Sequence, residues 1–400
     1  MAQLPITTIG VILLTASLAA IVSRLLRLPY SVGLVLGGIG LALLPAGIAL
    51  PLSRDLIFGI FLPPLIFEAA LQLKWPLFRR DLPVTLVLAF PGVALSALIV
   101  AAGMRFLVGW GWTGAALFGV LIAATDPVAV IAAFKELKVG RRLSMLVESE
   151  SLLNDGAAAV GFTMVAAIAA GDGVTPLAVA GSFLWTVVGG VMAGLVVAST
   201  LLVIAWRTDD HLVEITLTTI AAYGSFLLAE HFGMSGVLAS LSAGLLVGNL
   251  GARVLSRAGR AHVLAFWEYA AFLANSVVFI LIGGYEARQP IHHALIPAAI
   301  AVLLVLAGRA LAVYPLSALF APTALKVEGR YQHVLVWGGL RGALALALAL
   351  ALPETVPQRH EIIVVSFAVV AFSIFVQGLT MPWLIRRLGL VRDETASGDG

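Results

Sequence analysis

Long runs of apolar residues separated by short polar clusters dominate this chain. Val84–Ala102 and Leu177–Ala205 are predominantly apolar over about 20 residues or more, the length at which a helix crosses a bilayer. A membrane barrel would instead show short segments of alternating hydrophobicity. Dividing the chain at charged, Gly and Pro clusters predicts about thirteen helical spans. Their cores are 6–23, 29–44, 53–71, 82–103, 113–133, 144–170, 176–205, 212–229, 233–249, 262–284, 291–318, 331–351 and 361–385.

Composition agrees with an all-α polytopic membrane protein. Hydrophobic residues make up 61% of the 400 positions and charged residues only 11%, against about 25% charged in an average soluble chain. Cysteine is absent, which excludes disulfides and thiolate metal sites. We interpret the net charge of +3 as basic residues beside the membrane, and we expect no nucleic-acid partner.

The distribution of Lys and Arg predicts the orientation of the chain. Thirteen spans with the N-terminus outside place 18 of the 24 basic residues in inner connections and four in outer ones, as the positive-inside rule requires. The inner set is Arg24, Arg27, Lys74, Arg79, Arg80, Lys135, Lys138, Arg141, Arg142, Arg207, Arg253, Arg257, Arg260, Lys326, Arg330, Arg386, Arg387 and Arg392. The outer set is Arg54, Arg105, Arg288 and Arg359, and Arg309 and Arg341 fall within spans.

One membrane domain is expected over 1–387, followed by a short cytoplasmic tail over 388–400. Met1–Thr8 lacks a basic n-region and is interpreted as the approach to the first span. The tail is too short for a soluble module, and no GxxxxGK[ST] phosphate loop occurs, so nothing indicates ATP, a cofactor or an enzyme.

Ionisable residues inside apolar spans are costly and are therefore candidate functional residues. Asp126 precedes Pro127, which lacks an N–H and disfavours helix at the residue before it. A helix break at Thr125–Asp126 is predicted, with freed carbonyls available to a cation and Asp126 capping the next half-helix. The alternative is a capped proline kink with no transport role.

A second group of candidates lies in the stretch 148–156. Ser151 and Asp155 share one helix face, as do Glu150 and Asn154. These hard oxygen ligands suit an alkali cation rather than a transition metal. Glu148 is expected to lie in an interfacial first turn. Glu68 is a further carboxylate inside a span, and Glu268 and Arg309 are weaker candidates.

Arg341 lies among three glycines, Gly338, Gly339 and Gly342, which predict a second break. A buried Arg needs a carboxylate partner, and Glu150 is the predicted one, in a structural ion pair. The two breaks fall in the fifth and twelfth spans. With 176–205 as a linker, they occupy the same place in two inverted repeats, 6–170 and 212–387, an arrangement that builds ion sites at the midplane.

These motifs resemble the sodium/proton exchanger family, in particular the prokaryotic NhaP-type monovalent cation:proton antiporters. The matching stretches are Phe61–Ala69, Ala124–Val130, Glu150–Gly156, Phe272–Gly283 and Gly338–Leu346.

The resemblance implies a thirteen-helix fold with a six-helix core and a dimerisation domain, working as a homodimer in which the core moves like an elevator. Asp155 is then the exchanging carboxylate beside Asn154, with Thr125 and Asp126 on the broken helix. Ser151 and Glu68 help to hold the ion. Glu150 and Arg341 match a buried ion pair. Asn154 implies electroneutral exchange. Many relatives continue into a regulatory cytoplasmic domain that is missing from this sequence.

The predicted function is exchange of Na⁺, with Li⁺ as a further substrate, for H⁺ across a prokaryotic inner membrane. Na⁺ is expected at Asp155, Ser151 and Thr125, where it competes with a proton, and only the neutralised site crosses the barrier. K⁺/H⁺ exchange on the same fold and a carboxylate-lined cation channel are the alternatives.

Overall fold

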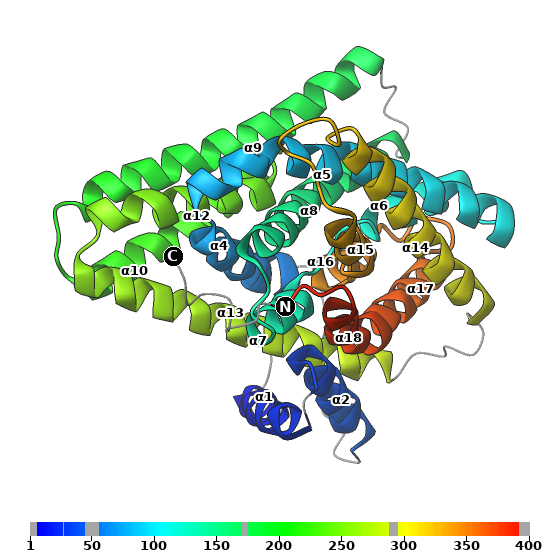
Figure 1. The fold of residues 1–400 in the computed structure, drawn as a ribbon, viewed down its shortest axis with the longest axis horizontal. Coiled ribbons are helices and arrows are strands. Elements are labelled where there is room, and N and C mark those ends of the chain that lie inside the picture. Colours follow the sequence, from blue (N-terminus) through cyan, green and yellow to red (C-terminus); the bar gives the residue numbers. More distant parts are fainter. Residues whose placement is uncertain (1–5, 27, 45–55, 170–174, 288–294, 392–400) are drawn as a thin grey trace.

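The protein folds into a bundle of helices in a computed structural model that describes residues 6–26, 28–44, 56–169, 175–287 and 295–391 (Figure 1). No strand occurs in these ranges. The helices are α1 (Ile6–Leu26), α2 (Tyr30–Leu43), α4 (Leu62–Gln72), α5 (Trp75–Gly103), α6 (Trp112–Leu121), α7 (Val128–Glu136), α8 (Arg141–Ala169), α9 (Pro176–Ala205), α10 (His211–Thr219), α11 (Ser225–His231), α12 (Gly236–Val254), α13 (Arg257–Glu286), α14 (Leu295–Ala318), α15 (Gly329–Trp337), α16 (Ala343–Leu350), α17 (Arg359–Phe372) and α18 (Leu379–Arg387).

Within the described residues, four π-helical turns continue or join these helices, at Ile57–Phe61, Met104–Val108, Ile220–Gly224 and Ser373–Gly378. Eight helical segments of the described ranges are long and apolar enough to cross a membrane. Every predicted span overlaps a described helix, or a pair of half-helices for 113–133 and 331–351. Some of the predicted features lie outside the described residues: most of the N-terminal approach, Arg27, Arg54, Arg288, the starts of the predicted spans at 53 and 291, and most of the predicted tail with Arg392.

The helices pack as two groups. The crossing group comprises α5–α8 and α14–α18, with α5 packed on α6, α8 and α14. The flanking group comprises α1, α2, α4 and α9–α13, with α12 packed on α4 and α9, and α13 on α2 and α4. In Figure 1, α10 and α12 lie at the left and α14–α17 at the right, with α4 and α8 between, while α9 runs across the upper part of the view and α13 across the lower part.

Both predicted helix breaks are present in the crossing group. α6 ends at Leu121 and α7 begins at Val128, while α15 ends at Trp337 and α16 begins at Ala343. Pro127 occupies the N-cap position of α7, and the three-glycine stretch separates α15 from α16. The two non-helical segments lie against each other, because the backbone N–H of Asp126 donates to the Leu340 carbonyl over 2.7 Å.

Gly342 is required for this close approach. A Cβ added at Gly342 would lie 2.2 Å from Asp126 Oδ2 and 2.4 Å from Asp126 Cβ, so any larger residue would push the two segments apart. The crossing therefore depends on a glycine in one segment and on a proline in the other.

Candidate ion site at the helix crossing

The charges at the crossing complement the ends of the half-helices. Asp126 accepts a hydrogen bond from the backbone N–H of Val128 over 3.0 Å, and the backbone N–H of Ala343 also donates to its carboxylate. One carboxylate thus caps the positive ends of both α7 and α16. Arg341 Nη1 donates to the carbonyls of Ala123 (2.6 Å) and Ala124 (3.1 Å), just after the negative end of α6. The buried backbone groups freed by the breaks gain charged partners in this way.

The predicted pairing of Glu150 with Arg341 is wrong in this structure. Glu150 forms a two-point ion pair with Arg309 of α14, with Nη1–Oε1 and Nη2–Oε2 distances of 2.7 and 2.8 Å. Arg309 Nε also donates to the Leu335 carbonyl over 3.1 Å. Arg341 contacts backbone carbonyls instead, because the break at Ala123–Ala124 leaves those acceptors unpaired within reach of its guanidinium.

A hydrogen-bond network ties α8 to the crossing through three predicted site residues. Ser151 Oγ donates to the Thr125 carbonyl over 2.6 Å. Asn154 accepts from the Thr125 N–H (3.1 Å) and donates to Thr125 Oγ1 (2.6 Å) and Glu150 Oε1 (3.1 Å). Asn154 is fully buried and does not line the cavity described below. Its bonds hold Thr125 in place, while direct ion contact by Asn154 stays a prediction.

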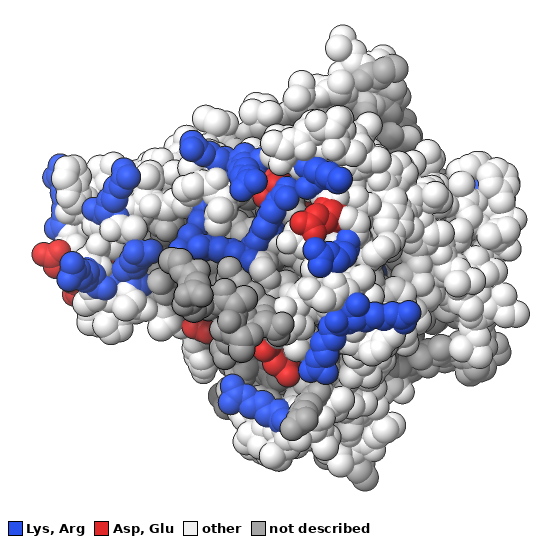
Figure 2. Space-filling view, in the orientation of Figure 1, with Lys and Arg blue, Asp and Glu red and all other residues white. Residues whose placement is uncertain are grey.

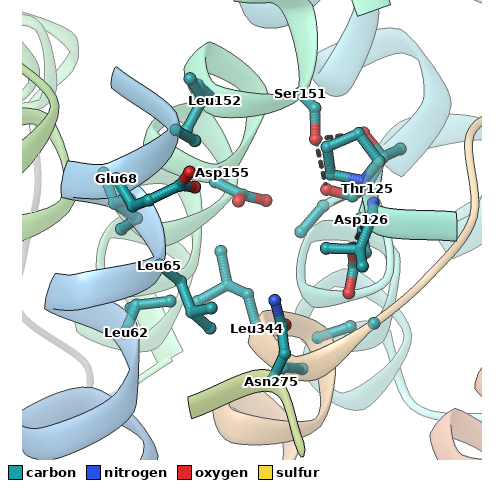
Figure 3. Close-up of a pocket in the computed structure, with 18 residues that line it drawn as sticks. Leu62, Leu65, Glu68, Thr125, Asp126, Ser151, Leu152, Asp155, Asn275 and Leu344 are labelled. Atoms are coloured by element: carbon teal, nitrogen blue, oxygen red, sulfur yellow. Dashed lines mark hydrogen bonds between the residues drawn. The ribbon is translucent and has the colours of Figure 1, made fainter. Parts of the chain in front are cut away.

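Asp155 points into a cavity of about 110 Å³ beside the crossing (Figure 3). Thr125, Asp126 and Ser151 line the same cavity from the crossing side, and Glu68 lines it from α4. Asp155 Oδ1 is buried and has no hydrogen-bond partner in the described part of the chain. A buried carboxylate oxygen without a partner is unfavourable unless a proton, a water or a cation satisfies it.

The structure thus brings five of the predicted residues around one small space. No cluster of three or more His, Asp or Glu side chains that would suit a transition metal occurs among the described residues. The available donors are carboxylate, hydroxyl and carbonyl oxygens, which suit a hard cation.

Glu68 also borders a second, wider cavity of about 510 Å³. Lys74, Lys135, Arg260 and Glu268 line this vestibule, and Gln72 donates a hydrogen bond to Glu68. The three basic residues belong to the set predicted to face the cytoplasm. Figure 2 shows Lys and Arg side chains gathered over the viewed face of the molecule. Glu68 therefore lies between the vestibule and the Asp155 cavity and lines both.

Sequence reasoning missed one polar residue of the cavity, Asn275 of α13. Figure 3 shows the nitrogen end of its amide directed into the space between Asp155 and Asp126. Asn275 carries no charge and lies in an apolar run, so the pattern of ionisable residues within the spans does not include it. Its position within a stretch matching the family motif was the available signal.

Two crossed, interrupted helices with a partnerless carboxylate beside them are the geometry of a secondary transporter's ion site. The model of the family "sodium/hydrogen exchanger, transmembrane" matches residues 12–387, and the chain belongs to this family.

Known relatives align with this sequence over almost its whole length. It is 38% identical over 387 residues to the Na⁺/H⁺ antiporter NhaS2 of Synechocystis, covering 95% of this chain and 70% of that protein. It is 32% identical over 395 residues to the Na⁺/H⁺ antiporter NhaH of Halobacillus dabanensis, covering 95% and 97%. The solved structure of the sodium proton antiporter MjNhaP1 of Methanocaldococcus jannaschii shares the fold, with a TM-score of 0.80, 20% identity and coverage of 96% and 98%.

Proposed function

We propose that this protein is a secondary antiporter that exchanges Na⁺ for H⁺, with Asp155 as the carboxylate that both ions share. The observation that carries the proposal is the Asp155 carboxylate, whose buried Oδ1 lacks a partner in the described chain and which faces a cavity lined by oxygen donors. Membership of the exchanger family, with relatives named Na⁺/H⁺ antiporters, supports it.

Exchange follows from competition for one charge. An ionised, desolvated carboxylate is costly, and either H⁺ or Na⁺ neutralises it. Only the neutralised site then crosses the barrier between the two sides, and the empty ionised site stays behind. Because one proton and one Na⁺ carry the same charge and Asp126 is committed to two helix caps, the exchange is one for one and electroneutral.

The cation is held by hard oxygens. We assign Asp155, Ser151 and Thr125 as ligands of Na⁺, with Glu68 at the entrance, partly through water. Ser151 Oγ uses its proton toward the Thr125 carbonyl, which leaves lone pairs for a cation. Li⁺ is a further substrate of the same donor set. No cofactor is required.

Alternating access is proposed to arise from movement of the crossing group against the flanking group. The cavity has one wall from each group, since Glu68 and Asn275 lie on α4 and α13 whereas Asp155 and Asp126 lie on the crossing side. We assign this arrangement to an inward-facing state, because Glu68 lines both the Asp155 cavity and the vestibule that carries Lys74, Lys135 and Arg260. Thirteen spans in two inverted repeats, with N-terminus outside and C-terminus inside, complete the proposal.

The proposed assembly is a homodimer in the prokaryotic inner membrane. α9 supports this, because only 22% of its most apolar window is buried within the chain. Its exposed side chains, among them Leu184, Trp185 and Val196, are available to a second copy or to membrane lipid.

The test is cation-dependent proton flux into proteoliposomes containing a pH-sensitive dye. Na⁺ and Li⁺ should drive proton movement that saturates with concentration and is unaffected by an imposed voltage. A response to K⁺ alone would identify K⁺/H⁺ exchange instead. Unitary currents without saturable counterflow would identify a channel.

A further inference from the structure

Asn275 is a neutral polar residue that lines the cavity, and the proposed exchange gives it no role. The other polar residues of the cavity wall are engaged: Thr125 and Ser151 bond each other, Asp126 caps two helices, and Glu68 accepts from Gln72. Asn275 makes no hydrogen bond within the described chain, although its amide faces the cavity and Asp155 (Figure 3).

The other two asparagines of the described spans behave differently. Asn154 uses its carbonyl oxygen once and its amide twice. Asn249 donates to the carbonyls of Leu73 and Leu245 and accepts from the Trp75 N–H. Both act as structural connectors. A partnerless amide within an apolar helix is costly unless water or a ligand satisfies it, so Asn275 is placed for a transient partner in the cavity.

The backbone around Asn275 is held firmly by the flanking group. Its neighbour Ser276 shares a 2.7 Å hydrogen bond with Tyr30 Oη of α2, and the Tyr30 ring stacks on Phe272 with centroids 5.3 Å apart. Farther along α13, a Cβ at Gly283 would lie 2.1 Å from the Val35 carbonyl, so α2 and α13 pack at backbone distance. Asn275 is therefore presented from a fixed wall opposite Asp155.

We propose that Asn275 is a specificity-determining residue of the flanking group that, after a half-turn of its amide about χ2, offers its Oδ1 to the transported cation. The inference rests on the proposed exchange at Asp155. A neutral oxygen adds a ligand without adding charge, so it raises cation affinity and keeps the one-for-one exchange. Because it belongs to the wall that does not carry Asp155, it serves the cation only while the cavity has this inward-facing alignment.

The test compares the Na⁺ dependence of proton flux in proteoliposomes for the wild type, Asn275→Ala, Asn275→Leu and Asn275→Asp. Removing the oxygen in Asn275→Ala or Asn275→Leu should raise the apparent KM for Na⁺ about 3- to 10-fold with little change in kcat, the loss expected for one neutral contact. Asn275→Asp keeps an oxygen at the same place and should have a KM at or below that of the wild type. Tyr269→Phe, at an exposed position of the same helix that lines neither cavity, is the matched control and should keep the wild-type KM.

The outcomes separate the two proposals. Absence of Na⁺-dependent flux in the wild type would overturn the exchange itself. Wild-type exchange with an unchanged KM in Asn275→Ala and Asn275→Leu would overturn the role of Asn275 alone. The role of Asn275 would also be overturned if Asn275→Asp raised the KM as much as Asn275→Ala. An equal rise would indicate that the side chain acts through packing and not through its oxygen. Three side chains of different size keep the test decisive if one variant fails to fold.

Discussion

Glu150 and Arg309 form a buried two-point ion pair that joins α8 to α14, with both N–O distances below 3 Å. Their side chains are 2% and 8% exposed. The same Glu150 carboxylate accepts from Asn154, which holds Thr125 at the crossing. The pair thus supports the ion site from behind and does not line the cavity.

Removing either partner should destabilise the fold. Glu150→Ala or Arg309→Ala leaves an uncompensated buried charge, and we expect each to lose about 3–5 kcal/mol of stability. The double variant should lose less than the sum of the two, because it strands neither charge. Thermal unfolding in detergent measures this. Arg330→Ala, which breaks an exposed pair with Glu328, is the control and should leave the melting temperature nearly unchanged.

Arg341 is the buried arginine against which the coupling of Glu150 with Arg309 can be compared. It contacts the Ala123 and Ala124 carbonyls and forms no hydrogen bond with Glu150, whose direct partner is Arg309. The coupling energy between Arg341→Ala and Glu150→Ala should therefore be smaller than that between Glu150→Ala and Arg309→Ala. A strong coupling energy between Arg341 and Glu150, with none between Glu150 and Arg309, would contradict the pairing.

Ser151→Ala should weaken Na⁺ binding with a small effect on folding. The change removes an oxygen at the cavity wall together with the 2.6 Å bond to the Thr125 carbonyl. Loss of one neutral contact predicts an apparent KM about 3- to 10-fold higher. Na⁺ titrations of proton flux measure it, with Ser366→Ala as a control, since Ser366 is buried but bonds only the Ile362 carbonyl of its own helix. An unchanged KM would rule out Ser151 as a ligand.

Lys135 should restrain cation entry through the vestibule. It is the basic residue whose charge acts on both Glu68 and Glu148, and it lines the vestibule beside Glu68. Lys135→Ala makes the entrance more negative, so the apparent KM for Na⁺ on the cytoplasmic side should fall at low ionic strength. Added choline chloride should reduce the difference, because salt screens exposed charges.

Lys326→Ala makes the same change in net charge at an exposed position that does not line the vestibule. It should leave the KM unaltered. An equal fall in both variants would mean that overall charge, and not the vestibule, governs entry.

The helix breaks were predictable from sequence because local chemistry causes them. Pro127 forbids regular helix at Asp126, and the glycines around Arg341 allow the second break. The chemistry of Asp155 and Ser151 on one helix face follows from their spacing, and the structure places both at the cavity. Each of these inferences depends on residues only a few positions apart.

Pairings between distant helices were not predictable in this way. Two arginines, Arg309 and Arg341, lie within predicted spans, and either could have paired with Glu150. The sequence does not show which side of α14 or of the α15–α16 break faces α8. Arg341 was assigned to a carboxylate because a buried guanidinium needs acceptors, but the acceptors turned out to be carbonyls freed by the other break. Asn275 was missed because a search for charge does not find a neutral amide.

The central claim is that one carboxylate, Asp155, binds H⁺ and Na⁺ in turn. The most direct measurement compares Na⁺-driven proton flux in proteoliposomes containing the wild type and Asp155→Asn, matched for folded protein by size-exclusion chromatography. Asparagine keeps the shape of the side chain and removes the titratable charge. We predict that the wild type exchanges Na⁺ for H⁺ and that Asp155→Asn is folded and inactive. Near-normal exchange by folded Asp155→Asn would contradict the account.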